Sequence, residues 1–159
     1  MKKLFILLYI LAGTLLLAGC KDSETSDIEV DPADERVTRP TDWITADALD
    51  PTSFMIVDLT ASDMPTTINA KDLLAAFVGE ECRGVAEPIQ MLDGGCEFTM
   101  LLMASMHEER NNEDVVLKYY SEEDGAIYLS KPIVFQPFEN WRPAESEKFK
   151  SEWKRNKTK

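Results

Sequence analysis

Apolar and polar side chains alternate along several short stretches of the chain, with the period of two that β-strands produce. The clearest stretch is 96–106, where one face is wholly apolar and the other mixes charged, polar and apolar side chains. Residues 53–61 and 115–120 alternate in the same way, and residues 126–130 and 132–136 add shorter stretches. About seven short strands at this spacing predict an all-β fold, an immunoglobulin-like antiparallel β-sandwich.

Turn residues separate these strands, at 93–95, 107–114 and 123–125. The segment 69–77 is less clear, because Asn69 can cap a helix and the local propensity favours one. The apolar run ends too soon for a stable helix. We therefore predict a strand over 73–78 that turns at 79–81.

The first twenty residues have the parts of an export signal. Lys2 and Lys3 precede an apolar run over residues 4–17, which is too short for a stable membrane span. The run ends in Leu-Ala-Gly-Cys at Cys20, and here the sequence resembles a bacterial lipoprotein precursor. The resemblance implies a lipid on the Cys20 sulfur and removal of residues 1–19, whereas the alternative is an ordinary signal peptide with a chance cysteine.

Residues 20–40 predict a flexible acidic linker, because they hold almost no large apolar side chain that could offset the entropy of ordering. At its start, Lys21, Asp22 and Glu24 are similar to the export signal that sends some lipoproteins to the outer face of the outer membrane. The predicted location is therefore the cell outer membrane, lipid-anchored and facing the exterior. A periplasm-facing anchor with a meaningless acidic tether is the alternative.

The predicted β-sandwich domain spans residues 41–141, and residues 142–159 form a basic tail. Pro143 can begin a helix there, and Phe149 and Trp153 are spaced four apart, so they would share one helix face. Because the tail lies outside the strand pattern, we expect it to dock weakly or to stay mobile.

The run AAFVGEECRGVA over residues 75–86 resembles a repeated motif of immunoglobulin-like modules in surface and secreted proteins of Gram-negative bacteria. That resemblance implies a β-sandwich with a non-catalytic accessory or binding role, and it carries no site residues. Physically, Gly79 permits a corner with positive φ, and Gly84 permits a close strand approach or a bulge. Arg83 is then held by Glu80 or Glu81 at the corner, or else contacts a ligand.

Composition and charge exclude several classes of function. The chain has 29 acidic and 17 basic residues, a formal net charge of −12, which excludes a protein that holds nucleic acid by bulk positive charge. The one histidine, His107, and the non-lipidated cysteines do not make a zinc site. Acidic loops at 111–114 and 122–124 offer oxygen ligands for calcium, but a solvated acidic loop is the simpler interpretation. We predict no enzyme, no cofactor and no metal.

Aromatic side chains bear on binding, because their faces can stack on sugar rings. The candidate ligand-facing residues are Arg83, Trp43, Tyr120, Tyr128 and Trp141, with Trp153 as a further ring. In a sandwich such rings often pack in the core instead. The prediction is a membrane-anchored binding module, for a glycan or, alternatively, a structural lipoprotein that docks on a partner protein of the envelope.

Cys82 and Cys96 remain after Cys20 is acylated, and an oxidising compartment would favour a disulfide. A hairpin at residues 93–95 argues against it. In that hairpin Cys82 lies near Met106, and ten or so positions at about 3.3 Å each separate the thiols, far beyond disulfide reach. The pairing becomes feasible only if Pro88 sends Cys82 into the other sheet.

Overall fold

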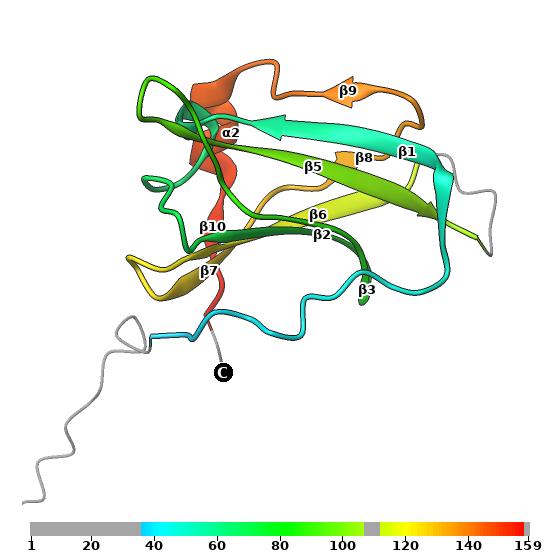
Figure 1. Cartoon of the computed structure of the whole chain (residues 1–159), viewed down its shortest axis with the longest axis horizontal. Helices are drawn as coiled ribbons and strands as arrows, with labels where there is room; N and C mark the ends of the chain where they lie inside the picture. The colour runs from blue at the N-terminus through cyan, green and yellow to red at the C-terminus, as the bar shows by residue number, and fades with distance from the viewer. Residues whose placement is uncertain (1–35, 107–111, 158–159) are drawn as a thin grey trace, which may run out of the picture. The chain divides into compact units, whose positions relative to one another are not determined.

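The computed structural model describes residues 36–106 and 112–157. These residues fold into an all-β sandwich of two sheets, to which a short helix is added, as the alternation of the sequence predicts (Figure 1). Within the described residues, no helix is both long and apolar enough to cross a membrane.

We call the sheet with the strand order β4-β5-β1-β9 the first sheet. Its strands are β4 (Ile89–Gln90), β5 (Cys96–Ser105), β1 (Leu49–Leu59) and β9 (Asn140–Trp141). The long strands β1 and β5 pair antiparallel, whereas β9 pairs parallel with β1. The positions that alternate in the sequence are therefore the inner and outer faces of this sheet.

The second sheet has the order β10-β7-β6-β2-β3, and β8 pairs with the start of β6. Its strands are β10 (Lys154–Arg155), β7 (Ala126–Leu129), β6 (Asp114–Ser121), β2 (Leu73–Val78), β3 (Glu81–Ala86) and β8 (Ile133–Val134). The predicted strand over 73–78 is confirmed as β2, which lies between β6 and β3. It resembles a helix in sequence because both of its faces are buried, so its residues do not alternate.

The strand orders match those of an immunoglobulin sandwich, in which A-B-E-D forms one sheet and C′-C-F-G the other. In chain order β1 to β7 take the places of B, C, C′, D, E, F and G. The A position is filled by β9, which follows G in the chain. The sequence did not predict this, because β9 is two residues long and carries no periodic signal.

The core lies between the two sheets. Many of its members come from the inward faces of β1, β2, β5 and β6: Met55, Val57, Leu59, Leu74, Phe98, Met100, Leu102, Val115, Leu117 and Tyr119. On β1, β5 and β6 these are the alternate positions that the sequence pattern assigns to one face. Burial of this alternating set is what fixes the register of the long strands.

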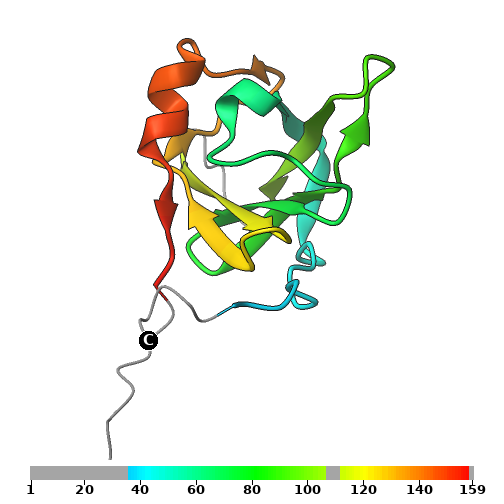
Figure 2. The same cartoon turned by 90° about the vertical axis from the view of Figure 1, so that its left-hand side faces the viewer.

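The C-terminal segment belongs to the domain, so the predicted boundary at residue 141 is wrong. Helix α2 (Ser146–Glu152) lies beside the short helix η1 (Ala61–Asp63) across one end of the sandwich (Figure 2). Phe149 and Trp153 are both buried in the main core, and the Trp153 indole donates a hydrogen bond of 2.9 Å to the Asp63 carbonyl. This short segment covers the end of the sandwich with two large rings. It has no strand-like alternation, so the strand pattern of the sequence does not include it.

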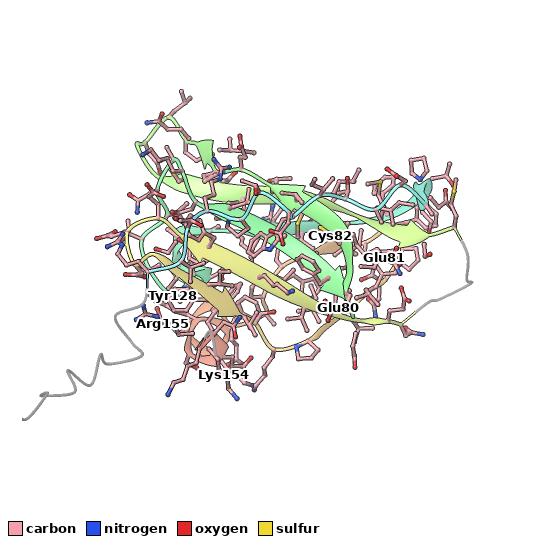
Figure 3. The ribbon with its side chains drawn as sticks, turned by 90° about the horizontal axis from the view of Figure 1, so that it is seen from below. Glu80, Glu81, Cys82, Tyr128, Lys154 and Arg155 are labelled. Atoms are coloured by element: carbon pink, nitrogen blue, oxygen red, sulfur yellow. The ribbon has the colours of Figure 1, made fainter. Side chains whose placement is uncertain are left out.

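The N-terminal boundary is also earlier than predicted. Residues 36–48, which we call the strap, run along the outer side of the second sheet (Figures 1 and 3). Val37 donates its amide to the Gly125 carbonyl at 2.6 Å, and Ala46 donates to the Cys82 carbonyl at 3.0 Å. Residues 20–35 of the predicted linker, the lipidation site and the export signal lie outside the described residues.

The predicted hairpin at 93–95 is confirmed, because Gln90 pairs with Cys96 and the Met91 amide donates to Gly95. The predicted position of Cys82 beside Met106 is wrong. The chain leaves the second sheet after β3, so Cys82 pairs with Phe77 on β2 instead. Both thiols are nevertheless free, because Cys82 lies in the cluster on the outer face of the second sheet, whereas Cys96 packs against the core between the two sheets.

Candidate functional site

Arg83 is a structural residue of the β3 corner and not an exposed ligand contact. Its side chain is only 2% exposed. Nε lies 2.9 Å from Glu81 Oε1, without hydrogen-bond alignment, and Nη2 lies 3.5 Å from Glu113 Oε2. Nη1 donates to the Met103 carbonyl at 3.4 Å. The guanidinium thus ties β3 to β5 and to the start of β6, with Glu81 as one of the two predicted partners.

Gly84 explains how β3 can lie so close to β5. A Cβ atom added to Gly84 would stand 2.5 Å from the Leu101 carbonyl oxygen, a contact that no side chain tolerates. The register of β2 and β3 also shifts between Ala76 and Phe77, as expected of a bulge. The motif over 75–86 therefore has a structural role at this strand junction.

Tyr120 and Tyr128 are held by neighbouring acids. Tyr120 is buried and donates to Glu122 Oε2 at 2.9 Å, and Tyr128 is half-buried and donates to Asp124 Oδ2 at 2.8 Å. Burial, followed by these hydrogen bonds, raises the pKa of Tyr120 and raises that of Tyr128 to about 12. The Tyr120 ring is therefore covered, and the Tyr128 ring is only partly exposed.

The tryptophans are also packed. Trp43 makes an edge contact with Phe77 at a centroid distance of 6.0 Å, and Trp141 makes one with Phe149 at 5.5 Å. Trp141 is partly exposed and lines a shallow hollow of about 200 Å³ with Lys148. The structure therefore brings the predicted ligand-facing residues to separate places and not to one platform.

The acidic loop over 122–124 is occupied by protein partners. Glu122 accepts from Tyr120 and Lys71, and Asp124 accepts from Tyr128. Among the described residues, no group of three or more histidine, cysteine, aspartate or glutamate side chains is placed to hold a metal ion. His107 and Asn111 lie outside those residues.

A different surface stands out, on the outer face of the first sheet. In the β1–β5 ladder Phe54 pairs with Met103, and Ile56 pairs with Leu101. Residues directly opposite in an antiparallel pair share a face, so these four side chains form one apolar cluster. Leu101 is 45% exposed, and the others are partly exposed.

Phe138 extends this cluster. Its ring packs edge-on against Phe54 at a centroid distance of 6.3 Å, and it is still 74% exposed. Its backbone is held at φ +67°, a left-handed conformation that is costly for a bulky residue. We call Phe54, Ile56, Leu101, Met103 and Phe138 the outer patch.

Polar groups border the outer patch toward the end of β1. Arg142 Nη2 lies 2.9 Å from Asp58 Oδ2, and Thr99 donates to Asp58 Oδ1 at 2.8 Å. Partial burial opposes ionisation of Asp58, but the bonds from Arg142 and Thr99 outweigh it and lower its pKa. These groups line a hollow of about 330 Å³ together with Glu97 and Asn140. The border therefore carries both signs of charge.

The β4–β5 hairpin beside this face is apolar as well. Ile89, Met91 and Leu92 are all exposed, and Ile89 pairs with Glu97, on the outer face of the sheet. The hairpin projects beyond the body of the sandwich (Figure 2). Its side chains are thus available to a neighbouring molecule.

The sequence contains the signal for the outer patch. In residues 53–61 and 96–106 the second face of each strand is mixed, with Phe54, Ile56, Leu101 and Met103 where a solvated sheet face would have polar residues. Only the pairing of β1 with β5 shows that these residues meet. Phe138 could not be found, because it lies in a connection without periodicity.

Comparisons with known proteins do not assign the chain to a family. No protein-family model matches the chain, no curated protein matches it, and no solved structure matches it. The resemblance of the motif over 75–86 to bacterial surface modules and that of Cys20 to a lipidation site therefore stay predictions.

Proposed function

We propose that the protein is a lipid-anchored, non-catalytic binding module of the outer membrane, which docks on a partner protein through the outer patch. Cys20 carries the lipid, and Lys21, Asp22 and Glu24 direct the protein to the exterior. The domain acts by presenting a surface, and neither a cofactor nor nucleic acid takes part.

The outer patch is the single observation that carries the docking part of this proposal. An antiparallel sheet that faces water normally alternates apolar inside with polar outside. Here β1 and β5 are apolar on both faces over the paired positions of Phe54, Ile56, Leu101 and Met103. Of the eight large apolar side chains that are well exposed among the described residues, five lie on this sheet, its hairpin or Phe138. Contiguous exposure of this kind is typical of interaction surfaces.

A photo-crosslinking amino acid placed in the full-length chain tests the docking surface in cells. Leu101 on β5 and Val134 on β8 make a matched pair, because they are 45% and 41% exposed and belong to different sheets. We expect a discrete crosslinked protein band from position 101 and none from position 134. Equal crosslinking from both positions, or none from position 101, would contradict the proposed docking surface.

Glycan binding remains a second candidate because of Trp141. This ring is partly exposed in the hollow of about 200 Å³, where Glu145 and Lys148 supply charged groups beside an aromatic face. A glycan array with the wild-type chain and Trp141→Ala tests it. Binding that is lost in Trp141→Ala supports this candidate, whereas an array without any signal rejects it.

A further inference from the structure

We infer that the partner on the outer patch is a second copy of this chain, packed face to face on the first sheet across a two-fold axis that runs along the strands between β1 and β5. This inference rests on the proposed role of the outer patch as a docking surface. It also specifies which side chains meet.

The position of the axis follows from the apolar pairs. Ile56 and Leu101 lie opposite each other at the middle of the outer patch, and Phe54 and Met103 lie opposite each other two residues away. Stacked sheets lie about 10 Å apart with their strands nearly aligned. An axis between β1 and β5 therefore places Ile56 of each copy over Leu101 of the other, and Phe54 over Met103.

The same axis produces charge complementarity. Arg142 lies on the β9 side of the patch, beside Asp58, and Glu97 lies on the β4 side. Rotation about the axis places the β9 side of one copy over the β4 side of the other. Arg142 then comes within about two residues of the second copy's Glu97 along the strand, an offset of roughly 7 Å. Together with the spacing between the two sheets, this offset is within the combined reach of the Arg142 and Glu97 side chains. The contact occurs twice in the dimer.

The β4–β5 hairpin contributes to the same contact. Ile89 and Met91 stand on the β4 side, so each copy places them over the β9 side of the other copy. There they would meet the segment after β9 that contains Pro143 and Ala144. The same dimer would therefore also bury the exposed apolar side chains of the β4–β5 hairpin.

The anchor suits this symmetry. A rotation about an axis along the strands keeps the two copies pointing the same way, so both chains leave from the same end of the dimer. The described chain begins at Arg36, beside the turn that joins β6 to β7. Both tethers can therefore reach one membrane, and anchoring in that membrane raises the effective concentration of the copies.

The size of the surface sets the expected strength. Stable interfaces bury about 1,200–2,000 Å² in total, with about 20 residues on each side. The outer patch, its charged border and the hairpin contribute fewer residues than that on each copy. We therefore expect a weak dimer without the anchor, with a dissociation constant on the order of 10–100 µM.

Sedimentation velocity on the chain from Lys21 onward, which retains every described residue, tests the inference. The wild type should shift from monomer to dimer between about 1 and 200 µM. Leu101→Lys should raise the dissociation constant at least about a hundred-fold, because the buried charge occurs twice in a two-fold interface. Val134→Lys, the matched control, should leave it unchanged. A wild type that stays monomeric throughout, or equal effects of both variants, would overturn the inference.

Charge reversal tests the predicted contact itself. Glu97→Arg should weaken the dimer about ten-fold, because it faces Arg142 of the second copy with like charge. Adding Arg142→Glu to it should recover most of that loss, although Asp58 then has an acidic neighbour. Failure of the double variant to recover any affinity contradicts this axis.

The two proposals can fail separately. If position 101 crosslinks in cells to a protein of a different mass while the purified chain stays monomeric, docking stands and self-association is wrong. If position 101 yields no crosslink and the chain stays monomeric, both are wrong. A crosslinked band at twice the mass of the chain supports both.

Discussion

The two outer faces of the sandwich are both apolar, but only one of them is covered by the described chain. On the second sheet, Phe77 and Cys82 are buried beneath the strap, where Trp43 packs on Phe77 and the Lys118 ammonium lies 3.7 Å from the centre of the Phe77 ring. On the first sheet, Leu101 and Phe138 remain open to solvent. Apolar residues on an outer face are therefore covered by the chain itself on one sheet and left exposed on the other, and the strand sequence alone does not distinguish the two cases.

The covering segments share one property, because each carries large rings outside the strand pattern. The strap supplies Trp43 to the second sheet, and the C-terminal segment supplies Phe149 and Trp153 to the end of the sandwich. If these segments are structural, their removal should destabilise the fold. Removal of side chains from the outer patch should not.

Deletion of residues 142–157 should have the largest effect. It removes Phe149 and Trp153 from the core and strips β10 from the edge of β7. Loss of two buried aromatic side chains should cost more than about 5 kcal/mol in the free energy of unfolding, enough to unfold a domain of this size. Urea denaturation followed by circular dichroism measures it. If the truncated chain folds with wild-type stability, the result would contradict this account and support the sequence-based prediction of a weakly docked tail.

Trp43→Ala should have an intermediate effect. The ring covers Phe77 and the Cys82 cluster, and its loss should cost about 2–3 kcal/mol, somewhat less than truncation of a fully buried aromatic residue. Cys82 should then react faster with a thiol reagent under native conditions. Phe138→Ala is the control, because it removes a ring that nothing in the described chain buries, and it should change stability by less than about 1 kcal/mol. Equal losses in the two variants would remove the contrast between the faces.

Alkaline pH should give the most gradual effect. Burial and hydrogen bonds to acids raise the pKa of Tyr119, Tyr120 and Tyr128, the last to about 12. The folded state thus holds more protons than the unfolded state once pH exceeds the ordinary tyrosine value of about 10. The contribution of these tyrosines to stability should be constant below that pH and fall as pH rises toward 12. Tyrosinate absorbance near 295 nm should appear together with unfolding, and a gradual rise at about pH 10 in folded protein would contradict the burial of Tyr120.

The sequence predicts the elements that alternate and misses those that do not. The inward faces of β1, β5 and β6 follow from a period of two, and the hairpin at 93–95 follows from its glycines. Strand β9, helix α2 and the strap are set by long-range packing of a few side chains, which leaves no periodic trace. The same limit hides the outer patch, since its halves lie more than 40 residues apart in sequence and meet only through the β1–β5 register.

A matched pair of substitutions at one outer position of each sheet tests the central contrast most directly. Phe77→Asn and Leu101→Asn each replace an outward apolar side chain with the same polar one, and urea unfolding is measured below about 1 µM, where the dimer is dissociated. We expect Phe77→Asn to cost about 3–4 kcal/mol, as for a buried ring, and Leu101→Asn to cost less than about 1 kcal/mol. A loss at Leu101 as large as that at Phe77 would show that the first sheet's outer face is part of the fold and not a surface kept for binding.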